Sequence, residues 1–141
     1  MTSALREISP PWAVSLPAQL AVVKALADPE YYAARYRETH VLREALASGL
    51  CALGIDVIPS MANFLLCHLP LAGPDAPTIC ERCRTQNVFL RDAGRMSSRL
   101  GSHALRVAVK DRESNPRIVE TLRWAMGKEQ ADLEETRRRA S

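Results

Sequence analysis

The stretch HALRVAVKD, residues 103–111, carries a single arginine at the centre of an apolar strand pattern. A β-strand turns alternate side chains to opposite faces, so one face is predicted to meet a core through Leu105, Val107 and Val109. The opposite face carries Arg106 between two alanines, which leave space beside the guanidinium. A planar group with five donors and open space beside it suits a carboxylate or a phosphate. A solvated polar face or an internal Arg–Glu pair would produce the same alternation.

Length and composition limit the classes of protein to consider. The chain has 141 residues, 47% of them apolar, which is enough for one domain with its own core. The net charge of +3 and the 5% aromatic content do not indicate a nucleic-acid partner. No apolar run approaches the roughly 20 residues of a membrane span, and residues 1–17 lack the pattern of a signal peptide. We therefore expect a cytoplasmic protein without a membrane partner.

Two of the four cysteines, Cys80 and Cys83, form a CxxC pair. A structural zinc site usually needs a second pair of ligands, and the spacing of Cys51 and Cys67 does not supply one. We expect structural thiols in a reducing compartment and no metal site. A small zinc or nucleic-acid protein, built on the CxxC pair and the arginines near the C-terminus, is the remaining alternative for these features.

Periodicity and breakers divide the chain into alternating elements. Helices are predicted over residues 17–27, 29–53, 76–86 and 116–126. Strands are predicted over residues 55–58, 63–69, 88–91 and 103–111, and a polar loop over residues 92–102. This order predicts an α/β (α+β) two-layer sandwich, in which a short mixed or antiparallel sheet has helices packed mainly on one face.

The two N-terminal helices carry different apolar patterns. The first is predicted to place Leu16, Leu20, Val23 and Ala27 on one face. The second is predicted to bury a leucine stripe, formed by Leu42, Leu46, Leu50 and Leu53. Charged residues of the second helix, including Arg43 and Glu44, are expected on its solvent side.

Four short motifs, in this order, carry a family resemblance. They are Pro10-Pro11-Trp12-Ala13-Val14-Ser15, Ala62-Asn63-Phe64-Leu65-Leu66, Leu90-Arg91-Asp92 and Leu105-Arg106-Val107-Ala108-Val109. Over about residues 5–127 the chain resembles the C-terminal small domain of class I/II aminotransferases, which are fold-type I enzymes dependent on pyridoxal 5'-phosphate. It is most similar to the histidinol-phosphate aminotransferase branch, which also includes threonine-phosphate decarboxylases.

The resemblance implies roles for individual residues. The position that matches Arg106 binds the α-carboxylate of the substrate, and the position that matches Arg91 helps to bind the substrate side chain, often a phosphate. Asn63 matches a position with an expected structural role at a turn or strand edge. Trp12 matches an often aromatic position near the domain junction. We treat Asn63 and Trp12 as possible site-lining residues.

The resemblance also implies a missing part. The family's catalytic lysine lies upstream of the Pro-Pro segment, whereas Lys24 follows that segment, so no catalytic residue is assigned in this chain. The expected organisation is a connector over residues 1–16, the small domain over 17–127 and a charged tail over 128–141. Pyridoxal 5'-phosphate is then the cofactor of the parent family and is not expected to bind this chain alone.

Two classes of function remain after these arguments. The first is the C-terminal domain of an aminotransferase, which would act on an amino-acid or phospho-amino-acid substrate with a missing large domain or a full-length relative as its partner. A fragment of a threonine-phosphate decarboxylase-like enzyme is a variant of this hypothesis. The second is a non-enzymatic module that binds an amino acid or phosphometabolite, or another protein. A homodimer is possible under either hypothesis.

Overall fold

The computed structural model describes residues 14–127, and these residues divide between Arg37 and Glu38 into two compact units. The first unit contains α2 (Leu16–Leu26) and the first turns of α3 (Pro29–Ala52), and the second unit contains the remainder. Trp12 and the tail over 128–141 lie outside the described residues. The expected boundaries at 16/17 and 127/128 stay predictions.

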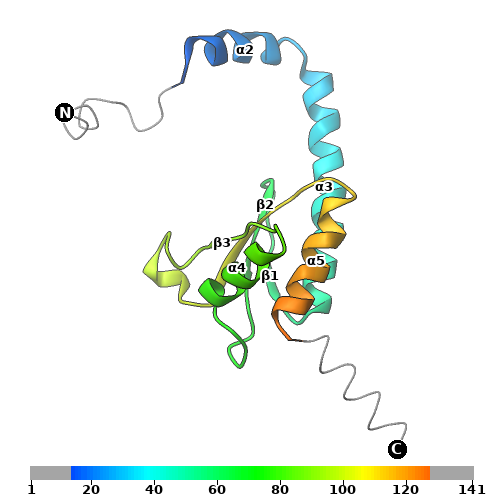
Figure 1. The fold of residues 1–141 in the computed structure, drawn as a ribbon. Coiled ribbons are helices and arrows are strands. Elements are labelled where there is room, and N and C mark those ends of the chain that lie inside the picture. The colour runs from blue at the N-terminus through cyan, green and yellow to red at the C-terminus, as the bar shows by residue number, and fades with distance from the viewer. Residues whose placement is uncertain (1–13, 128–141) are drawn as a thin grey trace, which may run out of the picture. The chain divides into compact units, whose positions relative to one another are not determined.

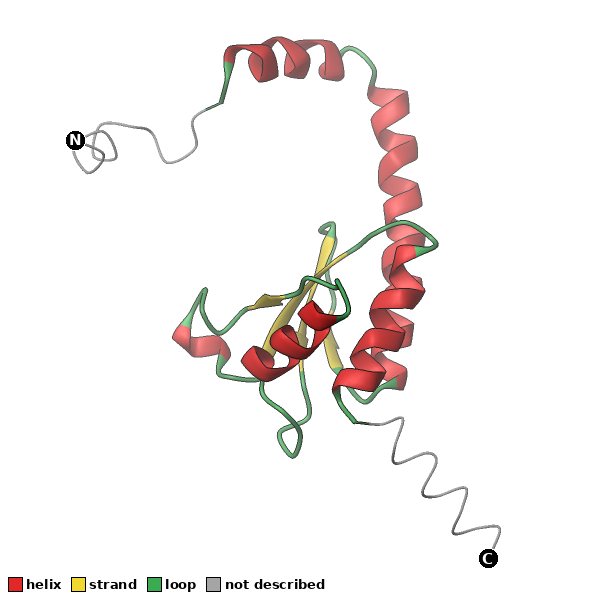
Figure 2. Cartoon of the chain, viewed as in Figure 1, coloured by secondary structure: helices red, strands yellow, loops and turns green. Residues whose placement is uncertain are grey.

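The second unit is built on a four-stranded sheet in the order β1-β2-β4-β3 (Figure 1). The strands are β1 (Asp56–Ile58), β2 (Phe64–His68), β3 (Arg91–Asp92) and β4 (Ala104–Ala108). Every neighbouring pair is antiparallel. The helices are the C-terminal half of α3, α4 (Ala76–Thr85) and α5 (Ser114–Ala125), with a 3₁₀ turn at Ser98–Leu100. The predicted α/β class with an antiparallel sheet is confirmed (Figure 2).

One face of the sheet meets the helices in a single core. The strands contribute alternate residues to this core, namely Leu65, Cys67, Leu105 and Val107. The helices contribute Leu46 and Leu50 from α3, Ile79, Cys80 and Cys83 from α4, and Ile118, Leu122 and Ala125 from α5, and Leu53 joins them just after the end of α3. The period-2 pattern of β4 therefore has the predicted orientation, with its large apolar side chains buried. Arg106 belongs to the opposite face.

Local hydrogen bonds shift two element boundaries from their predicted places. The backbone N–H of Val88 donates to the carbonyl of Cys83 at 3.0 Å, and Asn87 has a φ of 56°. This turn closes α4 and delays the edge strand until Arg91. At α5, the N–H of Ser114 donates to Asp111 Oδ1 at 2.7 Å, so the helix begins two residues earlier than predicted. The same bond lowers the pKa of Asp111.

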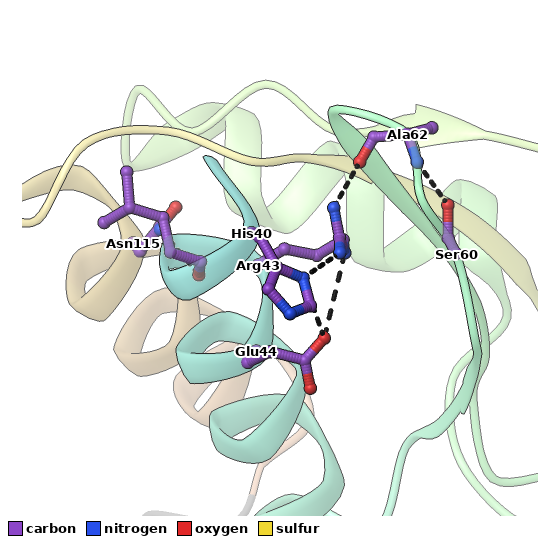
Figure 3. A network of polar contacts seen from close by, with 7 residues as sticks. His40, Arg43, Glu44, Ser60, Ala62 and Asn115 are labelled. Atoms are coloured by element: carbon purple, nitrogen blue, oxygen red, sulfur yellow. Dashed lines mark hydrogen bonds and ion pairs between the residues drawn. The ribbon is translucent and has the colours of Figure 1, made fainter. Parts of the chain in front are cut away.

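The expected solvent position of Arg43 is wrong, because this arginine is only 3% exposed. Its Nη1 donates to the carbonyl oxygen of Ala62 at 3.4 Å, and its Nη2 contacts Nδ1 of His40 (Figure 3). Oε1 of Glu44 lies 3.9 Å from Arg43 Nε. Arg43 precedes Leu46 by three residues, so it belongs to the buried stripe of α3 rather than to its outer side.

Helix α2 differs from the other α-helices that the structure describes, because none of its residues is buried. The apolar face predicted for it is present, but Leu16, Leu20 and Val23 are each more than 60% exposed. No helix within residues 14–127 is both long and apolar enough to cross a membrane.

Candidate carboxylate-binding site

The sheet register brings together two arginines that are fifteen positions apart in the sequence. On the central strand β4, Arg106 lies opposite Leu66 of β2 and opposite Arg91 of β3. Residues directly opposite each other in antiparallel strands share a face and have neighbouring Cβ atoms. Arg91 and Arg106, each singled out by a separate motif, are therefore cross-strand neighbours on the face away from the core.

The surroundings of Arg106 leave much of its hydrogen-bonding capacity unused. Its Cζ lies 4.0 Å from the centroid of the Phe64 ring, which gives a cation–π contact. Its Nε is buried and has no hydrogen-bond partner among residues 14–127. An aromatic face offsets part of the loss of hydration but accepts no strong N–H hydrogen bond. Neither an internal Arg–Glu pair nor a fully solvated side chain describes this arginine.

The two opposed arginines place like charges side by side. Like charges directly opposite on a sheet are destabilising, so this arrangement does not contribute to folding. An anionic group near both guanidinium groups would reverse the sign of the interaction, because Arg forms strong bidentate hydrogen bonds with carboxylate and phosphate. The geometry therefore suits recognition of an anion.

Arg91 also lines a polar cleft of about 630 Å³ near α4. Arg84 and Arg95 line the same cleft, together with Glu81 and Asp92. Glu81 Oε2 is already paired with Arg84 Nη1 at 2.8 Å. Arg106 does not line this cleft. We place the centre of the candidate site at Arg106, because its orphaned Nε, rather than the size of the cleft, indicates a missing acceptor.

Of the two residues expected to line the site, the structure describes Asn63 but not Trp12. The carbonyl of Asn63 accepts a hydrogen bond from the N–H of Val109 at 2.9 Å, just beyond the paired residues of β2 and β4. Its side chain is exposed. The contribution seen for Asn63 is thus a backbone contact at a strand edge, while Trp12 lies outside the described residues. The contact from Phe64 was not predicted, although Phe64 lies within the quoted Ala62–Leu66 motif.

The described residues do not fit pyridoxal phosphate as a resident group. A lysine that bonds an aldehyde cofactor is activated in apolar surroundings or beside another cation. The lysines within residues 14–127 are Lys24 and Lys110, and both are exposed. Arg106 is a binding group without an adjacent buried amine.

Three cysteines lie in the core and one lies at the surface. Cys67, Cys80 and Cys83 are buried free thiols, while Cys51 is exposed. Burial raises the pKa of Cys67 to about 12 and that of Cys83 to about 11. In the described part of the chain, no group of three or more His, Cys, Asp or Glu side chains is arranged to hold a metal ion.

We expect Cys51 to be alkylated first when the folded protein meets iodoacetamide at pH 8. The thiolate is the reactive form, and a raised pKa keeps a buried thiol protonated until the pH approaches that pKa. Mass spectrometry should find one fast label on the native chain and four labels after denaturation. Rapid labelling of Cys83 at pH 8 in the native state would contradict the buried position of the CxxC pair.

The fold places the chain in a known structural class. It is similar to the crystal structure of the histidinol-phosphate aminotransferase from Clostridium acetobutylicum, with a TM-score of 0.71 and 20% identity over 89% of this chain and 37% of that chain. It is also similar to a putative aminotransferase from Burkholderia pseudomallei, with a TM-score of 0.63 and 24% identity over 87% and 36% of the two chains. These likenesses show the fold of a domain found in aminotransferases.

Residues 1–122 match the family model of aminotransferase class I and II, and the chain belongs to that family. It is 32% identical to a histidinol-phosphate aminotransferase of Rhodopseudomonas palustris over 89% of this chain and 34% of that protein. It is 33% identical to histidinol-phosphate aminotransferase 1 of Caulobacter vibrioides over 88% and 34%. The chain thus spans about a third of the length of these relatives, as the small domain of that branch would.

Proposed function

We propose that this chain supplies substrate recognition to an aminotransferase, with Arg106 binding the substrate α-carboxylate. The observation that carries the proposal is the buried, unpartnered Nε of Arg106 on the sheet face away from the core. A carboxylate would accept two parallel hydrogen bonds from this guanidinium and neutralise its charge. Pyridoxal phosphate, which supplies the electron sink of transamination, would be held by the part of the relatives that this chain does not span.

Arg91 is proposed to bind a second anionic group of the same substrate. Its position opposite Arg106 places two cations close enough to hold two anionic groups of one small molecule. Arg91 is exposed, whereas Arg106 is half-buried, so Arg91 has the greater freedom to adapt to side chains of different length. A substrate with a carboxylate and a phosphate would use both arginines, which agrees with the phosphorylated substrate in the names of the relatives.

Titration of the chain with O-phospho-L-threonine and with L-glutamate tests this proposal. Calorimetry, with backbone amide NMR to locate the site, should show binding that shifts the signals of Arg106, Arg91 and Phe64. Arg106→Gln should weaken binding about 10- to 100-fold, because a hydrogen bond to a charged group contributes about 1.5–3 kcal/mol. Arg91→Gln should weaken the binding of O-phospho-L-threonine more than the binding of L-glutamate.

Arg99→Gln is the matched control, because it removes the same charge from an exposed arginine of the 3₁₀ turn. It should leave both affinities within twofold of the unmodified chain. Equal affinities in the unmodified chain, Arg106→Gln and Arg99→Gln would overturn the assignment of Arg106. Binding without transamination, even when the rest of an aminotransferase is added, would favour the non-enzymatic binding module instead.

A further inference from the structure

Phe64 and Arg106 meet diagonally across the two central strands of the sheet. In the register of β2 and β4, Phe64 lies opposite Ala108, which follows Arg106 by two residues. Diagonal neighbours in an antiparallel pair are within reach of each other when one is an aromatic ring and the other a long side chain. Because Ala108 carries only a methyl group, it leaves the Phe64 ring room to lean over Arg106. The Cζ of Arg106 lies over this ring, 4.0 Å from its centroid.

The ring covers one face of the guanidinium and leaves its edges available. The guanidinium is planar, and its five N–H groups point outward within that plane. A separation of 4.0 Å is that of two planar groups in face-to-face contact, since carbon atoms touch at about 3.5–4.0 Å. The ring attracts the cation from above the plane and takes up none of the in-plane donors. An anion that binds Arg106 therefore approaches within the guanidinium plane and beside the ring.

Carboxylates and phosphates place their oxygens differently around such a cation. A carboxylate is planar, so both of its oxygens lie in the guanidinium plane when it accepts two parallel hydrogen bonds. A tetrahedral phosphate or phosphonate that binds in the same way holds its other oxygens above and below that plane. At Arg106, one of these oxygens would be on the side that Phe64 covers. It would lose water without gaining a donor, and it would meet a ring whose face is negative.

We propose that Phe64 makes Arg106 selective for a planar carboxylate over a tetrahedral oxyanion, an inference that rests on the proposed function. The selectivity arises from the oxygen that a tetrahedral ligand leaves without water or a donor, which is one way in which binding sites reject the wrong ligand. Phe64 is thus a specificity-determining residue that acts through the guanidinium of Arg106. Both residues belong to the second unit and are half-buried, so the contact is formed before any ligand binds.

Arg91 provides the contrast within the same row of the sheet. It lies opposite Arg106 on β3, and its side chain is exposed. Within residues 14–127, no aromatic ring lies over its guanidinium. Oxygens on both sides of that guanidinium plane can keep their water. A ligand that carries both a carboxylate and a phosphate should therefore bind in one orientation, with its carboxylate on Arg106 and its phosphate on Arg91.

Titration with L-alanine and with its phosphonate analogue, which differ only in the acidic group, tests this selectivity. Binding is followed at the Nε–H NMR signal of Arg106, and the ratio of the two affinities is compared between variants. Phe64→Leu keeps an apolar side chain but removes the ring, and it should shift the ratio toward the phosphonate about three- to tenfold. Phe64→Tyr keeps the ring and should leave the ratio within about twofold of the unmodified chain.

The matched control is Phe89→Leu, the same substitution at the other phenylalanine of the chain, which is 74% exposed just before β3. It should leave the ratio within about twofold, as is usual for an exposed site. Arg91→Gln combined with Phe64→Leu should show the same shift relative to Arg91→Gln alone, because the shift arises at Arg106. Circular dichroism checks the fold of each variant, and Phe64→Met, which also lacks a ring, replaces Phe64→Leu if that variant does not fold.

A purely structural role of Phe64 would weaken both ligands equally, so an unchanged ratio in Phe64→Leu would overturn the proposed selectivity. A shift that vanishes in the Arg91→Gln background would also overturn it, because the phosphonate would then be bound by Arg91. Failure of the proposed function gives a different result. If neither ligand moves the Arg106 signal in the unmodified chain, Arg106 is not a carboxylate-binding residue and both proposals fail. Alanine binding with an unchanged ratio would overturn only the role of Phe64.

Discussion

Leu105→Ala is expected to lower the free energy of unfolding by about 3–5 kcal/mol, the range seen when a large buried side chain is truncated. Leu105 is 0% exposed and lies on the central strand β4, which pairs on both sides. The helices enclose it in the core, so neighbouring side chains can fill the resulting cavity only in part. A loss of this size is a large fraction of the 5–15 kcal/mol that stabilises a typical domain.

Urea denaturation followed by circular dichroism measures this loss. The control is Leu71→Ala, an identical substitution at an exposed leucine, which should change the free energy of unfolding by less than about 0.5 kcal/mol. Arg106→Gln, one residue further along β4, should also have a small effect, since the guanidinium makes no ion pair among residues 14–127. If Leu105→Ala were as stable as Leu71→Ala, the sheet face assigned to the core would be wrong.

Arg43→Ala is expected to lower the free energy of unfolding by about 2–4 kcal/mol, whereas Arg43→Met should have a much smaller effect. The alanine variant leaves a cavity where the buried arginine stem was and removes the donor to the Ala62 carbonyl. Methionine restores most of the apolar volume without a charge. Replacing a buried charge by an apolar side chain of similar volume is often neutral or stabilising.

The two Arg43 variants should be compared by the same denaturation experiment, and the exposed residue next to it provides the control. Glu44→Ala removes the carboxylate 3.9 Å from Arg43 Nε but should have an effect below about 1 kcal/mol, because Glu44 is exposed. Equal losses for Arg43→Ala and Arg43→Met would show that the charge, rather than the buried stem, stabilises the junction of α3 with the β1–β2 loop.

Periodicity predicted the elements of the second unit well, because its core lies at a single interface between the sheet and the helices. The period-2 pattern of β4 and the leucines of α3 each turn large apolar residues toward one layer interface. The predicted bounds failed at the edge strand and at the start of α5, where a few backbone bonds decide the conformation. Val88 was expected in a strand, but its N–H closes α4, and Asp111 accepts the N–H that begins α5.

The prediction for Arg43 failed for a different reason. Charge placed it on the solvent side of α3, while its spacing from Leu46 and Leu50 placed it on the buried stripe. The spacing was the better guide, because a long arginine stem can pack in a core when the guanidinium reaches acceptors at its edge. The spacing that places Arg43 on the buried stripe was present in the sequence, but the prediction gave more weight to the charge of arginine.

The sequence by itself determined the α/β class, the buried face of β4 and, through its motifs, the family and the two candidate arginines. Only the tertiary structure decided that Arg91 and Arg106 are cross-strand neighbours and that Phe64 stacks on Arg106. Strand register depends on turns and on pairing between distant segments, which local patterns do not specify. The lack of an acceptor for the buried Nε of Arg106 is likewise a property of packing, because burial depends on what surrounds a residue.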